Sequence, residues 1–144
     1  MLEEELQSLR SAFKGRMKPE RWVRDHLHPV DRLDAEDFVR DIEAGEDRAL
    51  LFQSAIPYFA MLTDEARVFL LPDYLGTIAK YEHVVSDVAI ELEPERSKSL
   101  LGSLTPAERA ALLRFIRALA ETEKMQFYLE ELRELEQMVE ASRK

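Results

Sequence analysis

The densest group of side chains that could bind a metal ion lies at Asp25-His26-Leu27-His28, with Asp31 three residues further on. Imidazole and carboxylate ligands suit zinc, manganese or iron. Two histidines two residues apart point to different sides of a helix, so His26 and His28 could share an ion only from a loop. The spacing matches no helical metal motif such as H-E-x-x-H. We therefore expect solvated histidines in a loop that ends a helix, and a metal-binding protein or enzyme using Asp25, His26, His28 and Asp31 is the alternative.

Other catalytic patterns are missing from the sequence. The chain has no cysteine, which excludes disulfides, thiolate metal sites and a cysteine nucleophile. No serine stands in the context of a nucleophile elbow. The four glycines are scattered, so they cannot form a glycine-rich phosphate loop. We therefore predict a non-enzymatic protein without a cofactor.

The overall charge constrains the class of partner. The net charge is −9, which argues against nucleic acid, because nucleic acids attract a positive surface. No apolar run approaches the roughly 18 residues that a membrane span needs. The start, Met1-Leu2-Glu3-Glu4-Glu5, is acidic and has no apolar core of a secretory signal. We expect a cytoplasmic protein that binds neither nucleic acid nor membranes.

Charge is unevenly distributed in the first third of the chain. A basic stretch runs from Arg10 to Arg24, and an acidic segment follows at residues 31–47. These segments are either two solvated helix faces that attract each other within the fold, or they include a face for a basic partner. The acidic candidates for such a face are Asp34, Glu36, Asp37, Asp41 and Glu43.

The elements that must position these side chains are predicted to be helices, because their apolar residues recur at helical spacing. The spacing of apolar residues and of capping residues predicts a helix over 2–14, a second from Pro19 to about Leu27, and a third capped by Asp34 with Phe38, Val39 and Ile42 inward and Gly45 past its end. It predicts further helices capped by Asp47 and by Thr63, and another that starts at Pro72. Aromatic residues such as Phe59 and Tyr74 are expected in the core.

The segment 84–93 fits either a strand or a helix, and we favour helix because a single short strand would have no partner. Residues 94–103 are expected to be a polar connection with at most one helical turn. The sequence thus predicts a single all-α domain over 1–144, a compact bundle of six or seven helices with a long C-terminal helix.

The C-terminal forty residues begin with a strong helix signal. Thr105 is a candidate N-cap, Pro106 suits the first helical position, and Glu108 completes a capping box. No glycine or proline follows up to Lys144. One straight helix of roughly 38 residues would be about 57 Å long, whereas the radius of gyration of a compact chain of this length is about 14.5 Å. A single straight helix would therefore extend beyond the domain, and other residues must cover the apolar side chains of the extending part.

The second half of this helix carries only a narrow apolar seam. In one alternative the chain bends near residues 121–123 and residues 124–139 fold back on their own domain. In the other, residues 121–144 form a projecting extension that pairs with a second copy of the chain. The interface residues of that homodimer would be Phe127, Tyr128, Leu132, Leu135, Met138 and Val139.

Three segments carry a family resemblance. They are Ile56-Pro57-Tyr58-Phe59 with Leu62 to Ala66, then Phe69 to Leu75, and finally Leu104 to Ala111 with Phe115-Ile116. Together they resemble a family of small bacterial proteins known only as a domain of unknown function, over roughly residues 47–120. The resemblance implies a helical bacterial protein, and it implies no activity, cofactor or catalytic residue. We expect an interaction protein, immunity- or antitoxin-like or a homodimeric adaptor, whose partner is itself or a basic protein.

Overall fold

The computed structural model describes residues 2–86, 88 and 94–142, and this part of the chain is all-α without a named strand. The all-α prediction is therefore confirmed. The described part of the chain has seven α-helices: α1 (Leu2–Ala12), α2 (Pro29–Glu43), α3 (Arg48–Ala55), α4 (Asp64–Lys80), α6 (Pro94–Gly102), α7 (Pro106–Ala120) and α8 (Leu129–Ala141). Three 3-10 helices join them: η1 (Ile56–Met61), η2 (Glu82–Val84) and η3 (Glu123–Tyr128).

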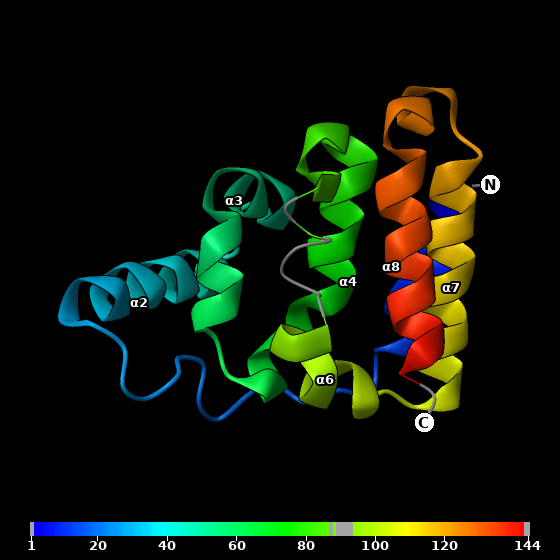
Figure 1. The fold of residues 1–144 in the computed structure, drawn as a ribbon. Helices are drawn as coiled ribbons and strands as arrows, with labels where there is room; N and C mark the ends of the chain where they lie inside the picture. Colours follow the sequence, from blue (N-terminus) through cyan, green and yellow to red (C-terminus); the bar gives the residue numbers. More distant parts are fainter. Residues whose placement is uncertain (1, 87, 89–93, 143–144) are drawn as a thin grey trace.

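The helices form a bundle with a smaller lobe beside it (Figure 1). In the bundle, α7 packs on α1 and on α8, and α4 contacts α1 and α6. The lobe consists of α2, α3 and η1, and α3 connects it to α4. Helix α2 reaches furthest from the bundle and has no helix on its outer side in Figure 1. The lobe therefore offers a surface that the bundle does not cover.

An aromatic cluster holds the lobe to the bundle. Phe59 of η1 stacks on Tyr74 of α4 with ring centroids 3.9 Å apart. Phe52 of α3 meets Tyr74 at 5.2 Å and Phe38 of α2 at 5.4 Å. Rings at these separations gain more than their buried area alone provides. The prediction that Phe59 and Tyr74 belong to the core is confirmed, because both are fully buried.

The predicted helix from Pro19 to Leu27 is wrong. Residues 13–28 form no helix, and Val23 makes an isolated antiparallel bridge with Leu62. The Trp22 carbonyl accepts from the Thr63 amide at 2.9 Å, and the Arg24 amide donates to the Met61 carbonyl at 2.9 Å. These long-range hydrogen bonds satisfy the backbone in place of helical ones.

Three other boundaries differ from the predictions. Helix α2 begins at Pro29 with His28 as its cap, so Asp34 lies inside the helix. Pro72 lies within α4 and starts no new helix, because burial on nearly all sides of α4 offsets the hydrogen bond that proline removes. Residues 94–102 form the helix α6, whose Leu100 and Leu101 are buried. The predicted helix at 84–93 falls largely on residues 87 and 89–93, which lie outside the described residues.

Several predicted caps are confirmed. The Asp47 carboxylate accepts from the backbone amides of Ala49 and Leu50 at the start of α3. The Thr63 hydroxyl accepts from the Ala66 amide at the start of α4. Gly45 ends α2 with φ +85°, a conformation that favours glycine. Short-range hydrogen bonding thus fixed these ends as the sequence indicates.

The C-terminal run is two helices that pack against each other. The Thr105–Glu108 capping box begins α7, as predicted, and α7 ends at Ala120. The chain then turns through η3, and α8 returns alongside α7 (Figure 1). Arg117 of α7 donates to Glu136 at 2.5 Å and to Glu140 at 2.9 Å on α8. The sequence left two alternatives open, and in the structure the C-terminal segment folds back on its own domain.

Candidate interaction surface

The predicted metal-competent residues are not brought together. Asp25 forms an ion pair with Arg21 at 2.7 Å, and the hydrogen bond from Arg21 lowers the pKa of Asp25 below its usual value. The Nδ1 atom of His28 accepts from the Val30 amide at 3.2 Å, so this nitrogen caps α2. His26 is exposed, with φ +64°. Asp31 lies in the first turn of α2. Within the described part of the chain, no three His, Asp or Glu side chains could hold a metal ion.

The predicted acidic face of α2 is divided between two sides of the helix, which corrects the expectation of one surface. Residues 34, 37 and 41 follow one another at helical spacing along one side, whereas residues 36 and 43 lie on the other. Glu43 pairs with Lys18 at 2.6 Å, and Asp37 pairs with Arg40 at 2.9 Å. Asp34 and Asp41 make no side-chain hydrogen bond or ion pair among the described residues. One acidic row, Asp34-Asp37-Asp41, is therefore largely uncompensated.

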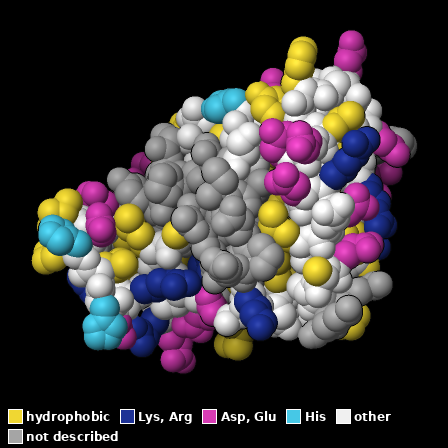
Figure 2. Space-filling model, viewed as in Figure 1, with side chains coloured by type: hydrophobic (Ala, Val, Ile, Leu, Met, Phe, Trp, Pro, Cys, Tyr) yellow, Lys and Arg dark blue, Asp and Glu magenta, His cyan; other side chains and the backbone are white. Residues whose placement is uncertain are grey.

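Two apolar side chains stand beside this row. Val30 is 57% exposed and Leu33 is 63% exposed, although both are aliphatic. They lie on the opposite side of α2 from Phe38, Val39 and Ile42, which are buried. Figure 2 shows hydrophobic and histidine side chains gathered at the left tip, over the start of α2. We call Val30, Leu33 and the row Asp34-Asp37-Asp41 the outer face of α2.

The other side of α2 borders a shallow groove. Its volume is about 490 Å³, and it lies between α2 and the segment that leads from Arg21 to Asp25. Its charged lining has both signs, with Arg32 and Arg40 near Glu36 and Glu43. The basic stretch of the sequence is thus neutralised mainly within the fold, through contacts such as Lys18 with Glu43 and Arg16 with Glu108. This groove consequently offers no surface of one sign.

The predicted C-terminal interface is mostly inside the protein. Leu132, Leu135 and Val139 are at most 1% exposed, because they pack on α7 within the same chain. Tyr128 and Met138 are partly buried against the same core. Only Phe127 remains open, with 93% of its surface exposed. The structure therefore corrects the assignment of Leu132, Leu135 and Val139 to an interface with a second chain, because these residues pack within their own chain.

Comparison of the chain with protein-family models, with curated proteins and with solved structures gave no match. The resemblance drawn from the sequence to a family of small bacterial proteins stays a prediction. The surface chemistry of the protein therefore carries the functional argument.

Sequence reasoning missed Val30 and Leu33. A signal for them was present, because both fall off the helical stripe that Phe38, Val39 and Ile42 define. With the helix start misplaced at Asp34, these two residues lay outside the predicted helix, and their position on its outer side was not visible. A cap formed by histidine and followed by proline marks the true start.

Proposed function

We propose that this protein is a non-enzymatic interaction protein that binds a basic protein partner through the outer face of α2. The observation that carries the proposal is the exposure of Val30 and Leu33 next to the uncompensated acids Asp34 and Asp41. Exposed apolar side chains beside acids that no cation in the described part of the chain compensates suit a partner with apolar and basic side chains.

The chemistry of the face indicates the chemistry of its partner. Val30 and Leu33 would fit an apolar side chain, and removal of aliphatic surface from water is worth about 25 cal/mol per Å². Asp34, Asp37 and Asp41 would fit Lys or Arg side chains spaced along a helix or an extended segment. Complementary charge accelerates encounter and rejects acidic competitors. An immunity- or antitoxin-like protein that masks a basic protein has this chemistry.

A homodimer through the C-terminal helix has less support. With Leu132, Leu135 and Val139 buried in their own chain, Phe127 is the large apolar side chain that remains exposed there among the described residues. A stable interface buries about 800 Å² on each partner, far more than one ring supplies. We therefore propose a different, basic chain as the partner.

The test compares two variants of equal charge. The triple substitution Asp34→Asn, Asp37→Asn, Asp41→Asn removes three acids from the outer face of α2. The control Glu123→Gln, Glu130→Gln, Glu134→Gln removes three exposed acids that make no ion pair among the described residues. The wild type, both triple variants and Leu33→Ser are used to capture partners from the native host, and bound protein is quantified at two salt concentrations.

The proposal expects a basic protein that the wild type and the control retain equally. The α2 triple variant and Leu33→Ser should lose it, and higher salt should weaken the wild-type complex. A photo-crosslinking group at position 33 should attach to the same protein, and one at position 134 should not. Equal retention by both triple variants, or a partner that crosslinks only at position 134, would overturn the proposal.

A further inference from the structure

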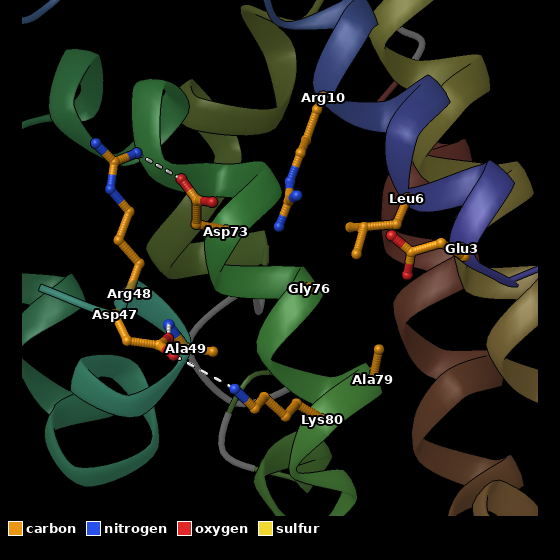
Figure 3. Close-up of a pocket in the computed structure, with 10 residues that line it drawn as sticks. All are labelled: Glu3, Leu6, Arg10, Asp47, Arg48, Ala49, Asp73, Gly76, Ala79 and Lys80. Atoms are coloured by element: carbon orange, nitrogen blue, oxygen red, sulfur yellow. Dashed lines mark hydrogen bonds and ion pairs between the residues drawn. The ribbon is translucent and has the colours of Figure 1, made fainter. Parts of the chain in front are cut away.

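A second hollow, of about 730 Å³, is lined by residues of α1 and α4 and by the start of α3. Helices α1 and α4 form its walls, and the start of α3 closes one side (Figure 3). The two walls present side chains at the same helical spacing, residues 3, 6 and 10 from α1 and residues 73, 76 and 80 from α4. Each wall thus has a charged residue at both ends and an apolar residue in the middle.

Small residues make the middle of the hollow. Ala49, Gly76 and Ala79 have little or no side chain there. A Cβ atom built on Gly76 would lie 3.2 Å from Cδ1 of Leu6, so Leu6 leans over the glycine where α1 and α4 meet. Aliphatic carbon and backbone atoms therefore line the middle of the hollow, and charged side chains lie around it.

One end of the hollow has excess positive charge. Arg48 forms an ion pair with Asp73 at 2.7 Å, so these two groups compensate each other. Arg10 makes no side-chain hydrogen bond or ion pair within the described part of the chain. Figure 3 shows its guanidinium extending from α1 into the hollow on the side of Asp73. An uncompensated guanidinium at this position suits a carboxylate.

The other end has excess negative charge. Lys80 pairs with Asp47 at 3.3 Å, and hydrogen bonds from the Leu50 amide and from Lys80 lower the pKa of Asp47. Asp47 is therefore ionised and compensated. Among the described residues, Glu3 accepts a hydrogen bond from Gln7 alone, and Figure 3 shows its side chain beside Leu6 and above Ala79. The Glu3 carboxylate is thus available to a cation.

The spacing of these two ends limits the ligand. Residues 3 and 10 are about 10 Å apart along the axis of α1, at 1.5 Å per residue. An extended peptide advances about 3.3 Å per residue, so a tripeptide has its terminal charges about 7–10 Å apart. We propose that the hollow binds a short peptide with free termini, its carboxylate on Arg10, its ammonium on Glu3 and its middle against the Leu6 side chain that covers Gly76.

The experiment follows backbone amide signals by NMR while trialanine is added to the whole protein. Three related probes accompany it: N-acetyl-trialanine, trialanine amide and free alanine, whose charges are too close together to reach both ends. The variants are Arg10→Gln and Glu3→Gln. The matched controls are Lys14→Gln and Glu4→Gln, which remove the same charges from exposed residues that do not line the hollow.

We expect trialanine at about 10 mM or below to shift the signals of Gly76 and Ala79. Arg10→Gln and Glu3→Gln should each weaken binding about tenfold, the effect of one charge-assisted hydrogen bond, and the controls should not. Blocking either terminus should weaken binding to a similar extent. Absence of shifts with trialanine would overturn the proposal, as would equal binding of the blocked peptides or of the Arg10→Gln protein.

Discussion

Helices α2 and α8 are both acidic and amphipathic, yet the fold treats them differently. In α8 the apolar residues Leu132, Leu135 and Val139 are covered by α7, and Arg117 pairs with two of its glutamates. In α2 one apolar set is buried, but Val30 and Leu33 are exposed. The difference lies in the number of apolar faces. One neighbouring helix is enough to bury the single apolar face of α8. Helix α2 has a second, smaller group of apolar residues that its own chain does not cover.

The two leucines give the largest expected contrast. Leu135→Ala should reduce the free energy of unfolding by about 2–5 kcal/mol, because it leaves a cavity between α7 and α8. Leu33→Ala should change it by no more than about 0.5 kcal/mol, because Leu33 is exposed. Urea unfolding of both variants measures the contrast. Similar losses at the two positions would mean that the outer face of α2 is packed in solution.

Two arginines give the next contrast. Arg109 is buried, and it donates to the carbonyls of Leu101, Leu104 and Ser142 and to the Ser142 hydroxyl, tying the ends of α6 and α8 to α7. Arg109→Leu should cost about 2–3 kcal/mol, because buried carbonyls lose their donor. Arg32→Leu in α2 should cost at most about 0.5 kcal/mol, since Arg32 makes one 3.3 Å hydrogen bond at the surface. Urea unfolding measures the loss of unfolding free energy in both variants, and equal losses would contradict this prediction.

Glu108 makes the bundle sensitive to acid. Burial raises the pKa of Glu108, but hydrogen bonds from Arg16 at 2.7 and 2.8 Å and from the Thr105 amide outweigh this and leave the pKa below its usual 4.5. A carboxyl with a lowered folded-state pKa stabilises the fold above its unfolded pKa. That contribution is lost as the pH falls through the folded value.

Glu108→Gln should therefore lower the melting temperature at pH 7, at a cost of about 1–3 kcal/mol. The gap to the wild type should shrink as the pH falls from about 5 towards 3. Arg16→Gln, which removes the main partner, should show the same trend. Asp34→Asn removes a charge from α2 without removing a contact among the described residues, and it should leave the melting temperature at pH 7 nearly unchanged. A constant gap for Glu108→Gln over this range would contradict the assignment.

The two helix caps give the smallest contrast. Thr105→Ala should cost about 1 kcal/mol, because the capping box at the start of α7 is lost. His28→Ala should cost less, within about 0.5 kcal/mol, because the exposed Val30 amide can be hydrated instead. Thermal unfolding of the two variants measures the difference between these losses of stability. A larger loss for His28→Ala would show that the start of α2 contributes more to the core than its exposure indicates.

Local chemistry explains which parts of the fold could be predicted from the sequence. Asp47, Thr63 and Thr105 each cap a helix through an amide two or three residues away, so their roles depend on neighbours in the chain. The buried stripes of α2 and α7 likewise follow from helical periodicity. These are short-range effects, and the all-α class follows from their sum.

The mistaken predictions concern segments with two local solutions. Residues 19–27 could form a helix, but Trp22 and Arg24 make backbone hydrogen bonds with residues 61–63 instead. Pro72 usually ends or begins a helix, but burial of α4 keeps the helix continuous. The two walls of the hollow, from α1 and α4, are far apart in the sequence, so no local pattern joins Arg10 to Gly76.

By itself the sequence determined an acidic, cysteine-free, all-helical chain and the caps that begin α3, α4 and α7, because composition and capping are properties of neighbouring residues. Only the tertiary structure decided that α8 returns to α7, that Val30 and Leu33 remain exposed, and that α1 and α4 enclose a hollow with opposite charges at its ends. Each of these depends on which surface is left after the rest of the chain has packed, and burial is a property of the whole fold.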